Sequence, residues 1–166
     1  MPPDMKQKQP SKNALKQQTR ERLTTLFKNA GMTIENHSAG AVNYISVSIP
    51  SSGQNCAAVY GSRGGAASLW MKQDAWELLR DEVNAAGIAE SLRIEDVDLF
   101  RRGFQWAVHF NSPSDSHLEM AVNACVESGK ERWRLTQERW AKEKAALAKR
   151  HEKEKEIASR RRDPFA

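Results

Sequence analysis

The chain has 166 residues, a net charge of +5, a hydrophobic content of 39% and a charged content of 28%. A chain of this length favours one domain with appendages, and such a domain can fold without disulfides or metals. The sequence has no run of about 18 apolar residues and no apolar segment after its first charges, so we expect neither secretion nor a membrane partner.

The two cysteines, Cys56 and Cys125, each lie in an apolar stretch. They form no CxxC motif, and this pattern favours buried, reduced side chains. Because reduced thiols persist in the cytoplasm, we expect a cytoplasmic location.

Charge is unevenly distributed along the chain. Residues 1–28 carry seven basic and two acidic side chains, residues 29–126 carry six and 11, and residues 127–166 carry 13 and eight. Two basic ends, each with a net charge of +5, therefore flank a middle with a net charge of −5. This asymmetry predicts a surface for a polyanion or for an acidic protein.

The chain begins with an arm and a helix. Residues 1–10 contain three prolines and no large apolar residue except Met, which is typical of a disordered arm. From Ser11 a helix is expected, with Leu15, Leu23 and neighbouring apolar residues on one face, and Gly31 is expected to end it.

Four strands are expected next. Apolar residues alternate with polar ones over residues 43–49, which predicts a half-buried strand with residues 32–36 as its hairpin partner. Residues 56–60 and 66–71 predict a second pair joined by the glycine-rich turn at 61–65.

A second helix and two more strands follow. Asp74 and Glu77 have the spacing of a capping pair, and Gly87 is expected to end this helix. Strands are expected over residues 91–99 and 104–110. The second carries four large residues at alternate positions, which we expect in the core: Phe104, Trp106, Val108 and Phe110. On its other face, His109 is expected to be a partly exposed structural histidine.

The last predicted element is one long helix that begins at Ser112 and Pro113 and ends near Arg162. Its first part is apolar on one face, and its last part, after Leu147, is almost entirely charged. A helix of about 50 residues would extend about 75 Å, which is further than a domain of this size needs for its own core.

The order of elements predicts an α+β domain, with a mainly antiparallel sheet of about six strands, helices on one face and a long charged C-terminal helix. We divide the chain into a basic arm (1–10), an α+β domain (11–130) and a charged helical extension (131–166).

No motif specifies a reaction, a metal or a cofactor. The loop at 61–65 lacks the lysine and spacing of a phosphate-binding loop, and the four histidines lack metal-ligand spacing. Glu95, Asp96 and Asp98 cluster, but a metal-dependent nuclease would need further ligands, so catalysis is the least favoured function. We therefore assign no catalytic residue.

Basic residues of the two terminal helices favour a non-catalytic nucleic-acid-binding protein that contacts the phosphate backbone. The predicted contacts are Lys12, Lys16, Arg20, Arg22, Arg132, Arg134, Arg139, Lys142, Lys149, Arg150, Lys153, Arg160, Arg161 and Arg162.

Trp133 and Trp140 lie among these arginines and could stack on bases, pack on the protein or form a self-association seam. The alternative function is a protein–protein interaction module, an inhibitor or adaptor, that uses the acidic middle or the long helix. The sequence does not distinguish DNA, RNA and protein as the partner.

Overall fold

The computed structural model describes residues 12–39, 42–61, 67–101, 103–111 and 114–162. Within these ranges, side chains are described except at residues 12–17, 38–39, 42–43, 61, 98–101 and 162. The chain divides into two compact units, Met1–Lys130 and Glu131–Ala166, which we call the body and the extension.

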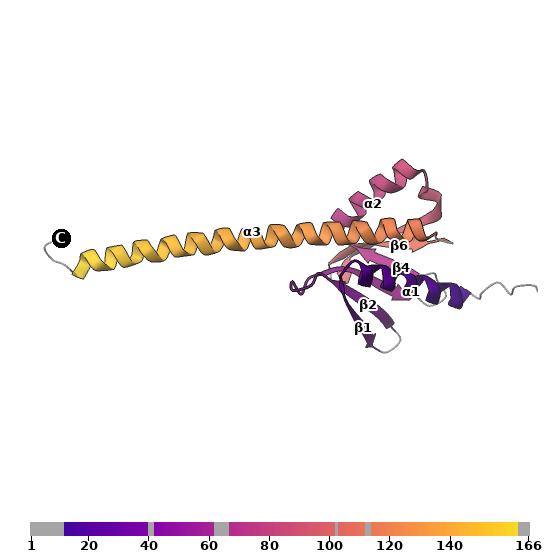
Figure 1. Cartoon of the computed structure of the whole chain (residues 1–166), viewed down its shortest axis with the longest axis horizontal. Helices are drawn as coiled ribbons and strands as arrows, with labels where there is room; N and C mark the ends of the chain where they lie inside the picture. Colours follow the sequence, from indigo (N-terminus) through magenta and orange to yellow (C-terminus); the bar gives the residue numbers. More distant parts are fainter. Residues whose placement is uncertain (1–11, 40–41, 62–66, 102, 112–113, 163–166) are drawn as a thin grey trace, which may run out of the picture. The chain divides into compact units, whose positions relative to one another are not determined.

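Six strands and three α-helices make up the described chain (Figure 1). In chain order the elements are α1 (Lys12–Asn29), β1 (Thr33–Ala39), β2 (Val42–Ser48), β3 (Asn55–Gly61), β4 (Ala67–Met71), α2 (Gln73–Ala86), the 3-10 turn η1 (Ala89–Ser91), β5 (Leu92–Arg101), β6 (Phe104–Phe110) and α3 (Asp115–Arg162). The strands form one antiparallel sheet in the order β1-β2-β3-β4-β6-β5. This confirms the predicted α+β class, the six-stranded sheet and the long C-terminal helix.

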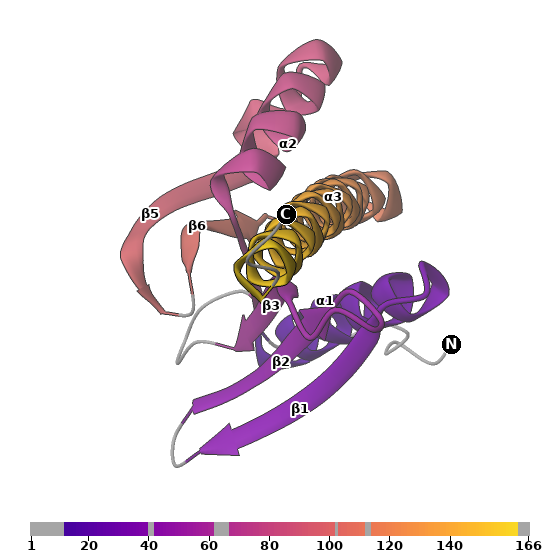
Figure 2. The same cartoon turned by 90° about the vertical axis from the view of Figure 1, so that its left-hand side faces the viewer.

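One face of the sheet carries the aliphatic core of the body. Across four strands, Ile45 pairs with Val59, Val59 with Leu69 and Leu69 with Val108, so their side chains share a face. Helix α1 and the first turns of α3 lie on this face (Figure 2). The sheet therefore buries its aliphatic side against two helices that are far apart in sequence.

Helix α1 packs through Leu23 and Phe27, which are one turn apart and fully buried. It ends as predicted at Gly31, whose φ of +84° is readily adopted only by glycine. The amide of Met32 donates to the carbonyl of Phe27, and the amide of Gly31 donates to Lys28. This C-terminal cap turns the chain into β1.

Within the body, α3 packs through Leu118, Val122 and Cys125, all of them buried. The predicted start at Ser112 and Pro113 is not where the helix begins, and those two residues lie outside the described chain. Ser114 is the capping residue instead, because its Oγ accepts a hydrogen bond from the amide of His117 at 3.4 Å.

The predicted N-terminal cap of helix α2 is also wrong. The predicted pair of Asp74 and Glu77 does not cap it, because the helix begins at Gln73 after Lys72, and Lys72 makes no side-chain cap. Glu77 accepts a hydrogen bond from the side chain of Gln73 at 3.1 Å. The predicted end at Gly87 is confirmed, with φ of +67°.

The face of the sheet opposite the aliphatic core also buries side chains, which the alternating pattern did not predict. Tyr44 and Ser46, expected on a solvent face, are both buried. His109, expected to be partly exposed, is also buried, and its Nε2 lies 3.1 Å from Oε2 of Glu95. Of the four predicted core residues of β6, Trp106 is partly exposed, and the other three are buried.

Candidate nucleic-acid interface

The basic residues of α1 divide into three groups. Lys12 and Lys16 lie in the helix, but their side chains are outside the described ones. Arg22 is bound to an acidic residue, whereas Arg20 lines an open groove. Of the four residues predicted on this helix, only Arg20 is therefore seen in a setting that suits a phosphate contact.

Arg22 forms an ion pair with Asp115, which lies 93 positions later in the chain. Its Nε donates to Oδ1 of Asp115 at 3.0 Å, and its Nη2 contacts the same oxygen. Because the guanidinium already has a carboxylate partner, it carries little net charge toward a phosphate. The pair links α1 to the first turn of α3.

Arg20 and Lys28 lie two turns apart on α1 and line a groove of about 530 Å³ with Thr24, Thr25 and Asn36. The groove also contains Glu21, so its charge is mixed. Two cations and several hydrogen-bond donors in an open groove are compatible with a phosphate contact.

In the extension, residues 131–162 carry 12 basic and six acidic side chains. From residue 137 to residue 161 every side chain is exposed. The exposed part of α3 from residue 137 to residue 161 therefore has a net positive charge, with nine basic and five acidic side chains.

Some of these charges are neutralised within the helix. Arg134 lies 2.6 Å from Glu131 and 3.2 Å from Glu138. The hydrogen bond from Arg134 lowers the pKa of Glu131, and the same bond raises the pKa of Arg134. Arg160 lies 3.7 Å from Glu156, one turn earlier in the helix. Arg134 and Arg160 are therefore weaker candidates for phosphate contact.

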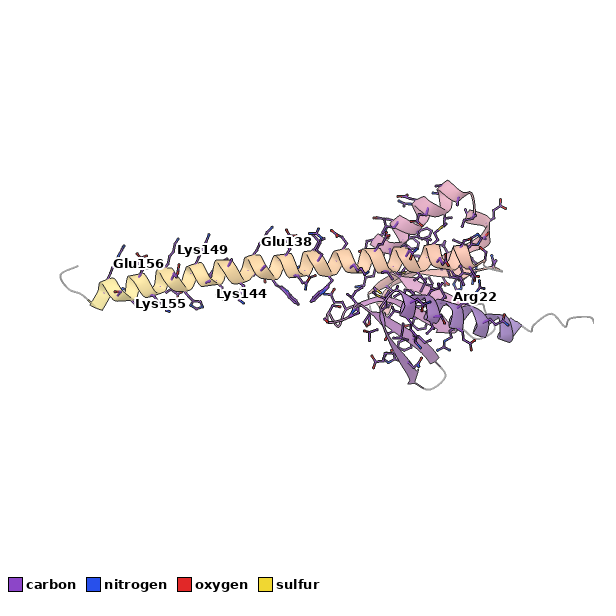
Figure 3. The ribbon with its side chains drawn as sticks, in the orientation of Figure 1. Arg22, Glu138, Lys144, Lys149, Lys155 and Glu156 are labelled. Atoms are coloured by element: carbon purple, nitrogen blue, oxygen red, sulfur yellow. The ribbon has the colours of Figure 1, made fainter. Side chains whose placement is uncertain are left out.

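Three lysines follow another pattern. Lys142, Lys149 and Lys153 are spaced by seven and four residues, so they lie along one side of the helix, and we call them the lysine row. Figure 3 shows Lys149 pointing to one side of α3, whereas Lys144 and Lys155 point to the other side. Among the described residues, no ion pair involves a lysine of this row.

The remaining predicted residues are exposed but do not form a row. Arg139, Arg150 and Arg161 are exposed, Arg132 is partly exposed, and the side chain of Arg162 is outside the described ones.

Trp133 and Trp140 are in contact along the helix. Their ring centroids are 5.5 Å apart at an interplanar angle of 88°, so the edge of one ring meets the face of the other. Leu147 follows after another seven residues, and Trp140 and Leu147 are each 51% exposed. We call Trp133, Trp140 and Leu147 the apolar seam.

The body contains a stack of rings that the sequence did not reveal. His37, Tyr44, Tyr60 and Trp70 lie on neighbouring strands, with successive ring centroids 4.6, 5.0 and 4.4 Å apart. Since each inner ring has both faces covered by its neighbours, the stack offers few faces to bases and instead packs this side of the sheet.

The acidic cluster of β5 does not converge. Glu95 and Asp96 are consecutive in a strand, so their side chains lie on opposite faces of the sheet, and Glu95 contacts His109. The side chain of Asp98 and residues 62–65 of the glycine-rich loop lie outside the described chain.

The described residues contain no group of three or more His, Cys, Asp or Glu side chains placed to hold a metal ion. None of their helices combines the length and apolarity needed to cross a bilayer. Comparison of the chain with protein-family models, with curated proteins and with solved structures finds no match.

Proposed function

We propose that this chain is a non-catalytic nucleic-acid-binding protein that contacts the phosphate backbone of DNA or RNA through the extension. The observation that supports this proposal best is the exposed lysine row, within a segment that has twice as many basic as acidic side chains. Each phosphate neutralised by a lysine releases condensed counterions, which favours binding at low salt.

In this proposal Lys142, Lys149 and Lys153 supply the central contacts, and the unengaged positive charge of Arg139 and Arg150 strengthens the local potential. Arg20 of α1 supplies a separate contact. Lysines and arginines that touch only phosphates read no bases, so we expect little preference for sequence.

The proposal is tested by the salt dependence of binding. Affinity of the full chain for labelled duplex DNA, single-stranded DNA and duplex RNA is measured by fluorescence anisotropy from about 50 to about 300 mM salt. We expect affinity to fall steeply with salt. Absence of binding at the lowest salt, or a complex that is insensitive to salt, would contradict the proposal.

Two double variants locate the contact. Lys142→Gln with Lys149→Gln removes two charges from the lysine row, and the slope of log affinity against log salt should become shallower by about two. Lys144→Gln with Lys155→Gln removes the same charge from the opposite side of the helix and should leave that slope nearly unchanged (Figure 3). Equal effects of the two variants would mean that the contact is diffuse.

We also infer a reducing compartment such as the cytoplasm. Cys56 and Cys125 are both buried, and they form no disulfide with each other. Buried thiols outside a disulfide are typical of proteins kept in a reducing environment. Localisation of a fluorescently tagged chain tests this inference, and export to an oxidising compartment would contradict it.

A further inference from the structure

The apolar seam is a helix face without a core of its own. Its three side chains recur every two turns and extend over about 21 Å. Trp140 and Leu147 each expose half of their surface to solvent. A helix gains most of its stability in proteins by burying such a face, so a partner that covers the seam would stabilise the extension.

Basic side chains border the seam on both sides. At about 100° per residue, Arg132, Arg139 and Arg150 lie on one flank and Lys144 on the other. Glu143 lies on the arginine flank, between the arginines and the seam, so between residues 132 and 150 this flank carries three arginines and one glutamate and keeps a net positive charge. The other acidic residue of this stretch, Glu138, lies on the far side of the helix, opposite Lys144 (Figure 3).

This charge pattern disfavours a second copy of the chain as the occupant. When two helices pack through a seam of this spacing, their flanking residues meet across the interface and determine which partners associate. Two copies would bring the arginines and lysines of one flank against those of another, and like charges at these positions repel.

The geometry of the tryptophans also disfavours nucleic-acid bases at this place. Stacking requires the open face of an aromatic ring. Trp133 and Trp140 meet edge to face, so one ring already covers part of the other. The pair forms an apolar ridge rather than two parallel platforms.

We propose that the apolar seam binds an amphipathic helix of another protein whose apolar face is flanked by Asp or Glu. The partner's apolar side chains would cover Trp133, Trp140 and Leu147, and its carboxylates would pair with Arg139 and Lys144. The lysine row lies on the other side of the extension, so this binding leaves Lys142, Lys149 and Lys153 accessible to phosphates and takes up only the charge of Arg139.

The test uses two synthetic peptides of about 24 residues, each long enough to cover the seam as a helix. They share one leucine seam and differ only in its flanks, which are Glu in one and Lys in the other. Binding to the full chain is measured by calorimetry and by the fluorescence of the tryptophans. We expect the Glu peptide to bind and the Lys peptide to bind at least about tenfold more weakly.

Matched variants test the residues. Trp140→Ala and Leu147→Ala should each lower the affinity of the chain for the Glu peptide by about tenfold. Leu135→Ala is the control, because Leu135 is 50% exposed on the same helix but lies off the seam. It should change affinity less than about twofold. Far-UV circular dichroism of each variant shows whether α3 keeps its helix.

If an alanine variant loses its helical structure, a charge swap still tests which residues flank the partner. Arg139→Glu with Lys144→Glu should reverse the preference, so that the Lys peptide binds more tightly than the Glu peptide. Lys142→Gln with Lys149→Gln should leave the preference unchanged, which separates this proposal from the phosphate contact.

Three results would overturn the proposal. In the first, both peptides bind equally well. In the second, the chain sediments as a dimer that Trp133→Ala with Trp140→Ala makes monomeric, so the occupant is a second copy. In the third, single-stranded DNA quenches the tryptophan fluorescence and neither peptide binds, so the occupant is nucleic acid.

Discussion

The backbone of Gly129 in α3 lies directly against the side chain of Cys56 in β3. A Cβ placed at position 129 would be 2.7 Å from Cβ of Cys56 and 2.9 Å from Cδ1 of Ile49. Carbon atoms that are not bonded do not approach so closely, so this crossing of helix and sheet requires a residue without a side chain. A glycine inside a helix weakens it by about 1 kcal/mol relative to alanine, and the close packing accounts for its presence.

Gly129→Ala should therefore destabilise the body although alanine is the better helix former. Overpacking a core by one methyl group costs about 1–3 kcal/mol, and the Cβ of Cys56 cannot move without its strand. Urea denaturation should show a lower free energy of unfolding. The control is Asn123→Ala on the exposed side of the same helix, which should be neutral or slightly stabilising. A stabilised Gly129→Ala variant would mean that α3 shifts away from β3 at little cost.

The ring stack should contribute to the stability of the sheet. Tyr60 lies between Tyr44 and Trp70, with centroid distances of 5.0 and 4.4 Å. Tyr60→Leu removes two ring contacts, and we expect a loss of about 1–3 kcal/mol in the free energy of unfolding. Tyr60→Phe keeps the ring and should cost less. If the two variants cost the same, the hydroxyl rather than the ring makes the important contact.

The order of the elements could be predicted from the sequence because each has a local signal. Alternation marked β2 and β6, and Gly31 and Gly87 marked the ends of α1 and α2. The ring stack could not be predicted, since it depends on strand register and joins four separate strands, beginning with His37.

Contacts between distant residues were hidden for the same reason. The sequence places Arg22 on the polar side of α1, but nothing local shows that Asp115 meets it. In the extension, by contrast, the spacing of Trp133 and Trp140 was visible, because neighbours along one helix follow from periodicity alone. Site residues within a helix were thus more predictable than those made by tertiary contact.

The two arginines of α1 should differ in their effect on nucleic-acid binding. Arg20→Gln removes a cation from an open groove, so we expect weaker binding and a salt slope that is shallower by about one. Arg22→Gln removes a cation already paired with Asp115, so binding should change less. Both side chains are partly exposed, and the surface ion pair of Arg22 should be worth less than about 1 kcal/mol of stability. Anisotropy and urea denaturation measure the two effects. A larger loss of binding for Arg22→Gln than for Arg20→Gln would contradict this assignment.

The ion pairs of the extension predict how one carboxyl group titrates. The hydrogen bond from Arg134 lowers the pKa of Glu131, because it favours the charged carboxylate. A carboxyl whose pKa is lowered by folding adds stability above its unfolded pKa and loses it as the pH falls through the folded value. In an NMR titration, the midpoint of Glu131 should lie below the ordinary glutamate value of about 4.3. Arg134→Gln should raise that midpoint toward the ordinary value. Arg139→Gln is the control. Arg139 is eight positions from Glu131, more than two helical turns away, so this change should not move the midpoint of Glu131. An unchanged midpoint in the Arg134→Gln variant would show that the pair does not persist in solution.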